Sequence, residues 1–309
     1  MSIKAIDQFL YHIALPQIEP GFNNFISTWV YKEKNFCLLV DPGPTSTINL
    51  LLEKLTSLGI MKGDLNYILL THIHMDHAGG AGKLLSFFPD ARVICHPRGI
   101  KHLIHPEKLW EATKKTLGTV ANMYGKIIPI PEEKILFQEF IEDQKIKAIE
   151  TLGHAPYHLA FLLKQYLFIG DAAGVYFPLP NNLYIRPTTP PIFDYDLAIS
   201  SLDKLISLNL SDYMICYAHF GLRENADKML RIAKKQLSVW KQVIERLFKT
   251  RTRPDFETTV IEKLREEDNY FANIDLFDDD VRKRELTFIG NNIKGITKFI
   301  EKKKSQEQI

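Results

Sequence analysis

The decapeptide "THIHMDHAGG" at residues 71–80 constrains the fold more than any other stretch of the chain. It places three histidines and one aspartate within six positions, although the 309 residues contain only ten histidines. The aliphatic run "YILL" precedes it and two glycines follow it, a pattern typical of a buried strand that ends in a tight turn. His72 and His74 are two residues apart, so their rings point to the same side as the chain leaves the sheet, and Asp76 and His77 come round on the turn. One segment can therefore present ligands to two adjacent metal ions.

The ligand types in this cluster indicate the kind of metal. Imidazole and carboxylate suit a borderline divalent ion, zinc foremost, with iron and manganese as alternatives. The cluster contains no cysteine, which argues against a structural zinc site held by thiolates. A histidine-rich loop without a ligand is the alternative, but four ligand-type residues in six positions favour a metal site.

Three further positions qualify as ligands. Each lies where an apolar strand is expected to end in a turn of small residues: His154 in "LGHAP", Asp171 in "FIGDAA" and His219 in "CYAHFG". Singly each is a weak signal, because a histidine or aspartate at a strand end is more often a hydrogen-bonded turn residue. Together they predict that four strand ends converge on one edge of the fold.

Composition excludes several classes of protein. Hydrophobic residues make up 45% and charged residues 25% of the chain, the balance of a globular protein with a sizeable core. The net charge of +2 is too small for an electrostatic track along nucleic acid, so we expect no nucleic-acid partner. Three cysteines in apolar stretches are expected to be buried thiols, and neither a signal peptide nor a membrane-spanning run is visible. We therefore expect a cytoplasmic protein that does not bind membranes and acts on a small molecule.

The alternation of apolar runs predicts an α+β fold. Strands are expected at residues 25–31, 36–44, 65–72 and 91–97, and again at 134–140, 145–154, 158–165, 166–173 and 213–221, with helices at 46–59, 79–90, 104–123 and 194–209 between them. Strands that come in two runs capped by helices favour two sheets packed face to face with helices outside. After His219 no histidine or cysteine occurs, and helices are expected at 224–249, 257–270 and 281–300. We assign residues 1–222 to a metal-binding catalytic domain and residues 223–309 to a helical extension.

The motif series resembles that of one known family. H-x-H-x-D-H at His72 to His77, followed by His154, Asp171 and His219 and preceded by Asp41 in "VDPG", is similar to the series of the metallo-β-lactamase superfamily of hydrolases. The likeness covers roughly residues 10–222. It implies the αββα four-layer sandwich of that family, here with a C-terminal helical extension.

The resemblance also implies a role for each position. His72, His74 and His154 would hold one metal ion, Asp76, His77 and His219 the other, and Asp171 would bridge both. Asp41 would orient a ligand without binding metal itself. Two divalent ions, zinc before iron or manganese, would supply a metal-bound hydroxide that attacks a carbonyl, with Asp76 accepting the proton of the nucleophile.

Departures from the family narrow the substrate. The bridging position holds Asp171 and not cysteine, which argues against β-lactamase activity and resembles glyoxalase II, acyl-homoserine lactonases and related esterases. In "GHAPYHLAF", Tyr157 stands where such hydrolases often have a small glycine, so a bulky phenol is expected to reshape the pocket. No basic cluster assignable to glutathione is visible. We expect hydrolysis of a small ester, thioester or lactone.

The segment "GVYFPLPNNLYIRPTTPPIFDY" at residues 174–195 directly follows the bridging Asp171. Five prolines predict a loop, which either covers a sheet edge or forms a substrate-binding wall. In the second case Tyr176, Phe177 and Tyr184 would be apolar contacts and Arg186 an anchor for a carboxylate or phosphate.

Two other functions remain open. A mononuclear iron enzyme acting on persulfides would share most of these residues, and a non-catalytic scaffold that retains metal would share all of them. The intact ligand set favours the enzyme. The apolar face from Ala226 to Leu247 needs a partner surface, and we expect it to form a homodimer or to cover the pocket.

Overall fold

The chain forms two compact units in a computed structural model that describes residues 3–142 and 145–307. Unit 1 comprises Met1–Glu150, Tyr157–Gly170 and Cys216–Gly221. Unit 2 comprises Thr151–Pro156, Asp171–Ile215 and Leu222–Ile309. Both units are built from segments distant in sequence, and each is described by itself. The assignment of residues 1–222 and 223–309 to a catalytic domain and an extension stays a prediction.

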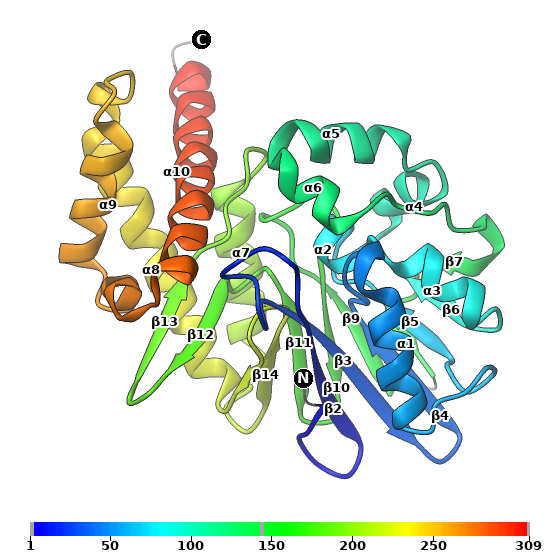
Figure 1. The fold of residues 1–309 in the computed structure, drawn as a ribbon. Coiled ribbons are helices and arrows are strands. Elements are labelled where there is room, and N and C mark those ends of the chain that lie inside the picture. The colour runs from blue at the N-terminus through cyan, green and yellow to red at the C-terminus, as the bar shows by residue number, and fades with distance from the viewer. Residues whose placement is uncertain (1–2, 143–144, 308–309) are drawn as a thin grey trace. The chain divides into compact units, whose positions relative to one another are not determined.

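The first sheet of unit 1 has seven strands in sequence order (Figure 1). Strands β1 to β4 pair in antiparallel fashion and β4 to β7 pair in parallel. The strands are β1 (Ile3–Ala5), β2 (Leu10–Leu15), β3 (Ile26–Glu33), β4 (Phe36–Val40), β5 (Tyr67–Leu69), β6 (Arg92–Ile94) and β7 (Ile135–Leu136). All five residues of β4 are buried, as expected for a strand covered on both faces.

The second sheet of unit 1 contains four strands among the described residues. These four pair in antiparallel fashion in sequence order: β8 (Phe140–Ile141), β9 (Ile146–Glu150), β10 (Leu159–Leu163) and β11 (Tyr166–Gly170). The rings of Trp29 on β3 and Phe168 on β11 lie 6.2 Å apart, so the two sheets share one core. The expected face-to-face packing of two sheets is confirmed. Strand β14 (Met214–Tyr217) and the short β15 (Leu222–Arg223) bracket the segment that carries His219.

Helices α1 to α6 belong to unit 1. Helix α1 contacts β2, and α4 contacts β7. A single expected helix at 104–123 is in fact two, because Gly118 has a φ of +56° and ends the first of them. The helices are α1 (Ile48–Ser57), α2 (Met75–Ala78), α3 (Ala81–Phe87), α4 (Pro97–Ile104), α5 (Glu107–Leu117) and α6 (Thr119–Tyr124).

The described residues of unit 2 form a β-hairpin and four α-helices. The hairpin is formed by β12 (Val175–Leu179) and β13 (Asn182–Arg186), where the sequence led us to expect a loop. The helices are α7 (Tyr195–Ile206), α8 (Ala226–Leu247), α9 (Phe256–Glu267) and α10 (Asp279–Glu307), the last three near the expected ranges. The side chains of Asp194 and Asn225 accept hydrogen bonds from backbone N–H groups in the first turns of α7 and α8, which defines where these helices begin.

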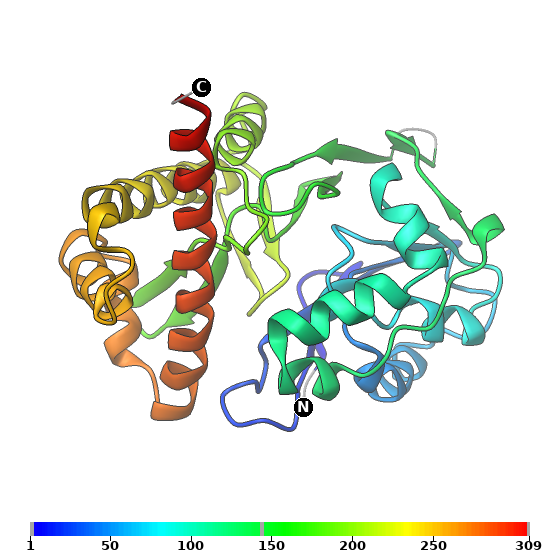
Figure 2. The same ribbon diagram turned by 90° about the horizontal axis from the view of Figure 1, so that it is seen from above.

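The apolar face of α8 is buried inside unit 2. Leu230, Leu237, Trp240 and Ile244 are each at most 5% exposed. Helix α8 contacts α7, α9, α10 and β13, and Figure 2 shows α8, α9 and α10 side by side. This face therefore finds its partner surface within the chain, and the expected homodimer through the C-terminal helices stays a prediction.

The three cysteines, Cys37, Cys95 and Cys216, are buried and not paired in disulfides, as expected. Burial raises the pKa of the Cys37 and Cys95 thiols to about 12. Among the described residues, no helix combines the length and the apolar character needed to cross a membrane.

Candidate metal centre

The first two histidines of the motif follow β5, and contacts with neighbouring side chains orient the ring of His72. His72 is fully buried, and its ring stacks on that of His158 at 4.9 Å. The Thr71 hydroxyl donates to Oδ2 of Asp41 at 2.6 Å, so its oxygen accepts from Nδ1 of His72 at 3.1 Å. The proton of His72 is thereby placed on Nδ1. Its Nε2 carries the lone pair and lies 2.9 Å from Nδ1 of His74.

Asp76 and His77 lie on α2, a single helical turn. His74 occupies the position just before this helix. Shortly after α2, Gly80 packs closely against α1: a Cβ there would lie 2.3 Å from Cδ1 of Ile48. The glycine that follows the motif is thus needed for a close approach.

His77 and His219 are held by different parts of unit 1. Nδ1 of His77 lies 3.0 Å from Oδ2 of Asp41, and Nδ1 of His219 donates to the carbonyl oxygen of Phe25 at 3.1 Å. The Phe25 ring also stacks on His219 at 4.2 Å, and a β-bridge joins His219 to Ile26. Carboxylate and carbonyl oxygens accept here, so both imidazoles carry their proton on Nδ1 and present Nε2 as the donor atom for a metal.

These constraints bring three ligand atoms together. One donor atom each of Asp76, His77 and His219 lies within 4.8 Å of the others. Oδ2 of Asp76 is 3.8 Å from Nε2 of His77 and 3.9 Å from Nε2 of His219. These distances are too long for hydrogen bonds, whereas two donors that each lie about 2.0–2.2 Å from one ion are separated by at most about 4.4 Å. The residues of unit 1 therefore fit a divalent metal ion.

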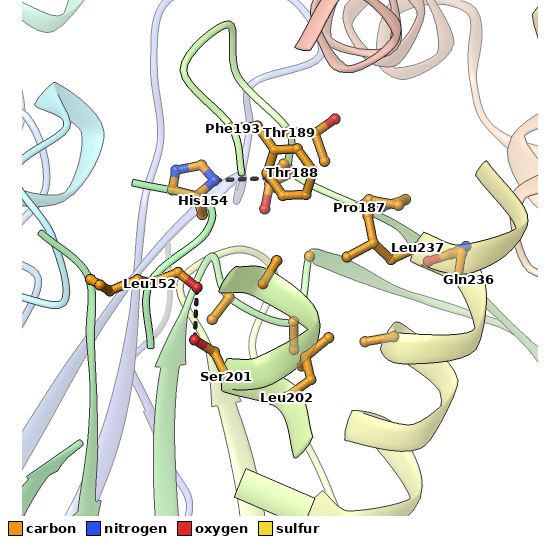
Figure 3. A pocket seen from close by; sticks show the side chains of 15 residues that line it. Leu152, His154, Pro187, Thr188, Thr189, Phe193, Ser201, Leu202, Gln236 and Leu237 are labelled. Atoms are coloured by element: carbon orange, nitrogen blue, oxygen red, sulfur yellow. Dashed lines mark hydrogen bonds between the residues drawn. The ribbon is translucent and has the colours of Figure 1, made fainter. Parts of the chain in front are cut away.

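Unit 2 holds the other two expected ligands. Nε2 of His154 lies 3.4 Å from Oδ2 of Asp171, the spacing of two ligands at the corners of one tetrahedron. Nδ1 of His154 donates to the carbonyl oxygen of Thr188 at 3.0 Å (Figure 3). The Thr188 hydroxyl donates to the backbone carbonyl of Asp171 at 2.6 Å. One threonine thus fixes the proton of one expected ligand and the backbone of the other.

Of the seven expected ligands, five lie in unit 1 and two in unit 2. Each unit brings its own members together. Sequence reasoning missed the two threonines that hold them, Thr71 and Thr188, because a single threonine beside a histidine or between prolines is no recognisable signal.

The four residues expected to form a substrate-binding wall lie on the hairpin and have different surroundings. Tyr176 is 3% exposed, and the Phe177 ring packs on Phe277 at 4.6 Å. The Tyr184 hydroxyl donates to Oε2 of Glu285 at 2.9 Å, and Nε of Arg186 donates to the same oxygen at 2.5 Å. The structure thus gives Arg186 a partner within the protein, where the sequence led us to expect a substrate anion.

Tyr157 lies in unit 1 near His74, one of the expected metal ligands. Its ring centroid is 6.3 Å from that of His74 and 6.4 Å from that of His102. Burial raises the pKa of its phenol, so the side chain is neutral at physiological pH.

A cavity of about 20 Å³ lies in unit 2 between the segment at Pro187–Thr189 and helices α7 and α8 (Figure 3). Its lining includes His154, Thr188, Ser201 and Gln236. That volume holds about one water molecule and is too small for an ester substrate. The cavity is therefore a packing feature behind His154.

Two curated relatives share the sequence of this chain over much of its length. The metallo-beta-lactamase fold-containing protein ST1585 of Sulfurisphaera tokodaii is 33% identical over 190 residues, which cover 57% of this chain and 70% of that protein. A hydroxyacylglutathione hydrolase of Hamiltonella defensa is 31% identical over 208 residues, which cover 67% of this chain and 65% of the hydrolase. The chain thus spans about two thirds of the length of these relatives.

Solved structures share the fold. The structure of ST1585 from Sulfolobus tokodaii matches with a TM-score of 0.62 and 28% identity, over 74% of this chain and 86% of that one. The metallo-beta-lactamase family protein TTHA1429 from Thermus thermophilus matches with a TM-score of 0.61 and 23% identity, over 92% and 93% of the two chains, and shows the fold alone. The expected α+β sandwich with C-terminal helices is confirmed.

The family model described as the metallo-beta-lactamase superfamily matches residues 22–219, the stretch from the loop before β3 to the last histidine of the motif series. That stretch contains all seven expected ligands. With the ligand geometry of the two units, it shows that the chain belongs to the metallo-beta-lactamase superfamily.

Proposed function

We propose that this chain is a dinuclear metal-dependent hydrolase that cleaves a small ester, thioester or lactone. The observation that carries the proposal is the arrangement of Asp76, His77 and His219 in unit 1. Their donor atoms converge within 4.8 Å, and the Nδ1 protons of both imidazoles are already held by protein oxygens. Orientation of this kind is what metal-ligating histidines require.

We further propose the assignment of ligands that the resemblance to the superfamily implies. His72, His74 and His154 would hold one ion, Asp76, His77 and His219 the second, and Asp171 would bridge them. The membership of the superfamily and the spacing of donor atoms within each unit support this assignment. Imidazole and carboxylate donors favour zinc, with iron and manganese as alternatives.

When bound, two such ions lower the pKa of a coordinated water and polarise the carbonyl of the substrate. Asp76 would be suited to accept a proton from a nucleophilic water. Its side chain is 18% exposed, whereas those of His77 and His219 are 1% and 3% exposed. The carboxylate is thus the part of the cluster in unit 1 that solvent and substrate reach, and the buried imidazoles fix its surroundings.

The acyl group is expected to lie near Tyr157. Its neutral phenol, close to His74, would provide an aromatic surface with one polar group at its edge. The relatives named hydroxyacylglutathione hydrolases support a thioester among the candidate substrates. Tyr176 and Phe177 of the hairpin stay predictions as further pocket residues.

The proposal is tested by metal content and by chelator-sensitive turnover. The purified chain should contain two equivalents of divalent metal, and the reconstituted protein should hydrolyse aryl esters or thioesters that the chelated protein leaves intact. A chain that takes up no metal and shows no chelator-sensitive hydrolysis in a screen of esters, thioesters and lactones would refute it. One equivalent of iron with persulfide oxidation would replace it by the mononuclear alternative.

A further inference from the structure

The segment Pro187–Thr189, which we call the strap, connects the hairpin to the expected metal ligands of unit 2. Its middle residue, Thr188, uses its carbonyl oxygen to accept from Nδ1 of His154 and its hydroxyl to donate to the backbone carbonyl of Asp171. Any movement of the strap therefore moves the hydrogen-bond partners of both residues at once.

Helix α10 holds the strap on both sides of Thr188 through one side chain. Nδ2 of Asn292 donates to the carbonyl oxygen of Pro187 at 2.6 Å, and its Oδ1 accepts from the backbone N–H of Thr189 at 2.9 Å. The Thr189 hydroxyl donates to the backbone carbonyl of Asn292 at 2.9 Å. Asn292 is 5% exposed, so these bonds form away from water, where an unmatched polar group costs about 1–3 kcal/mol.

A second residue on the same face of α10 brings the helix backbone against the strap. Gly295 follows Asn292 by three positions, which places both on one side of the helix. A Cβ at Gly295 would lie 2.0 Å from the carbonyl oxygen of Thr189 and 2.5 Å from that of Pro190. Only glycine fits this approach, so the distance between helix and strap is fixed independently of the asparagine.

We propose that helix α10 positions His154 and Asp171 for metal binding, with Asn292 as the positioning residue that acts through Thr188. The inference rests on the proposed function, because it takes these two residues as metal ligands. Asn292 fixes the strap, and the Thr188 carbonyl fixes the proton of His154 on Nδ1. Nε2 is thereby kept as the donor atom, 3.4 Å from Oδ2 of Asp171. The C-terminal helix is then part of the support of the metal centre, although it contributes no ligand.

The test compares Asn292→Ala with Asn291→Ala in the full-length protein. Asn291 is the adjacent residue on α10, and among the described residues no hydrogen bond joins its side chain to the strap. Zinc affinity is measured by competition with a chromophoric chelator. We expect Asn292→Ala to bind at least one zinc equivalent about tenfold or more weakly than wild type, and Asn291→Ala to remain within about twofold.

A readout that needs no metal separates this inference from the proposed function. In the metal-free protein, ¹⁵N NMR of the histidine side chains reports which ring nitrogen carries the proton. Wild type and Asn291→Ala should show His154 protonated on Nδ1, and Asn292→Ala should show a mixture of the two tautomers. If wild type binds no zinc, the proposed function fails while the tautomer of His154 still decides whether the helix orients it.

A second variant changes the position of the strap through a different residue of α10. Gly295→Ala leaves Asn292 intact but pushes the strap away, so it should weaken zinc binding and alter the His154 tautomer in the same direction. Should Asn292→Ala fail to fold, as judged by circular dichroism, Thr189→Val removes only one of the three bonds and serves in its place. Wild-type zinc affinity and a wild-type His154 tautomer in the folded variants would overturn the proposal.

Discussion

Oδ2 of Asp41 lies 3.0 Å from Nδ1 of His77, across a sequence separation of 36 residues. The same oxygen accepts from the hydroxyl of Thr71, and Oδ1 accepts from the Thr71 backbone N–H at 2.8 Å. Through these bonds one buried carboxylate determines the proton positions of two expected ligands, His72 and His77. Asp41 itself adopts a positive φ of 51°, a left-handed conformation that aspartate and asparagine adopt more often than other residues with a side chain.

Asp41→Asn should weaken metal binding without removing a ligand. An amide can accept through only one of its two terminal atoms, so either His77 or Thr71 loses its acceptor. We expect about 10–100-fold lower zinc affinity, measured by chelator competition. Asp90→Asn makes the same change at an exposed site and should leave the affinity unaltered. Equal affinities for the two variants would contradict the role of Asp41.

Asp76→Asn should lower the rate of hydrolysis more than any substitution outside the ligand set. It removes the negative charge of an expected metal ligand, which is also the expected proton acceptor. We expect kcat to fall by about 10²–10⁴-fold, with a smaller change in KM, in assays on an aryl ester or thioester identified as a substrate. Zinc content is measured in parallel. A variant that keeps full zinc content and full kcat would exclude Asp76 from the chemistry.

Glu285→Gln should destabilise the protein strongly. The Glu285 carboxylate is fully buried and bonds to Arg186, Arg284 and Tyr184. Removing its charge leaves two buried guanidinium groups without their counter-ion, which typically costs about 3–5 kcal/mol. Urea unfolding at pH 7 measures the loss. Glu262→Gln, at an exposed position on α9, should change the free energy of unfolding by less than about 0.5 kcal/mol.

The Glu285 carboxylate should also make the free energy of unfolding depend on pH below pH 5. Burial alone would raise the pKa of Glu285, but Arg186 and Arg284 outweigh burial and lower it to about 2. A lowered pKa stabilises the folded state above the ordinary value of 4.5, and this contribution is lost as the pH falls toward about 2. The difference in unfolding free energy between wild type and Glu285→Gln should therefore be constant above pH 5 and shrink toward pH 2. A difference that stays constant down to pH 2 would contradict the assignment.

His12 should make the stability of the folded state depend on pH in a higher range. Burial, with a smaller contribution from Lys4, lowers the pKa of this imidazole from 6.5 to about 4. The unfolded chain takes up the proton first, so stability is complete above pH 6.5 and falls as the pH drops toward 4, by up to about 1.4 kcal/mol per pH unit.

His12→Gln removes this titration and keeps a polar group near Ser27, the partner of His12 at 2.8 Å. Urea unfolding at pH 7 and pH 5 should show a smaller loss of stability for His12→Gln than for wild type. His105→Gln changes an exposed histidine and should behave as wild type. The idea fails if His12→Gln loses as much stability between these pH values as wild type does.

The expected metal ligands and the fold class could be predicted because both follow from local patterns in the sequence. Apolar runs such as those of β4, β5 and β11 show where strands end, and ligand-type residues at those ends are visible without any tertiary information. The first strands, β1 and β2, were not predicted, because the residues from Lys4 to Leu15 mix polar and apolar side chains without clear alternation.

The hairpin and the partner of Arg186 could not be predicted for a different reason. Prolines disfavour strands in general, but Pro178 lies in a two-stranded hairpin, where each strand has an open edge. Arg186 is the only basic residue of an apolar segment, and its partner Glu285 lies 99 residues downstream. No local sequence pattern connects such a pair. An arginine that pairs with a buried glutamate therefore cannot be told apart, in the sequence, from one that binds a ligand.

The interleaving of the two compact units has a consequence for biosynthesis. Unit 1 needs Cys216–Gly221, and unit 2 needs residues from three separate stretches of the chain, so no single cut releases either of them whole. A nascent chain that has emerged as far as α7 still lacks both His219 and Asn292. Assembly of the expected metal-binding residues must therefore wait until the segment with His219 has emerged, and shorter nascent chains are poor candidates for capture of zinc on the ribosome.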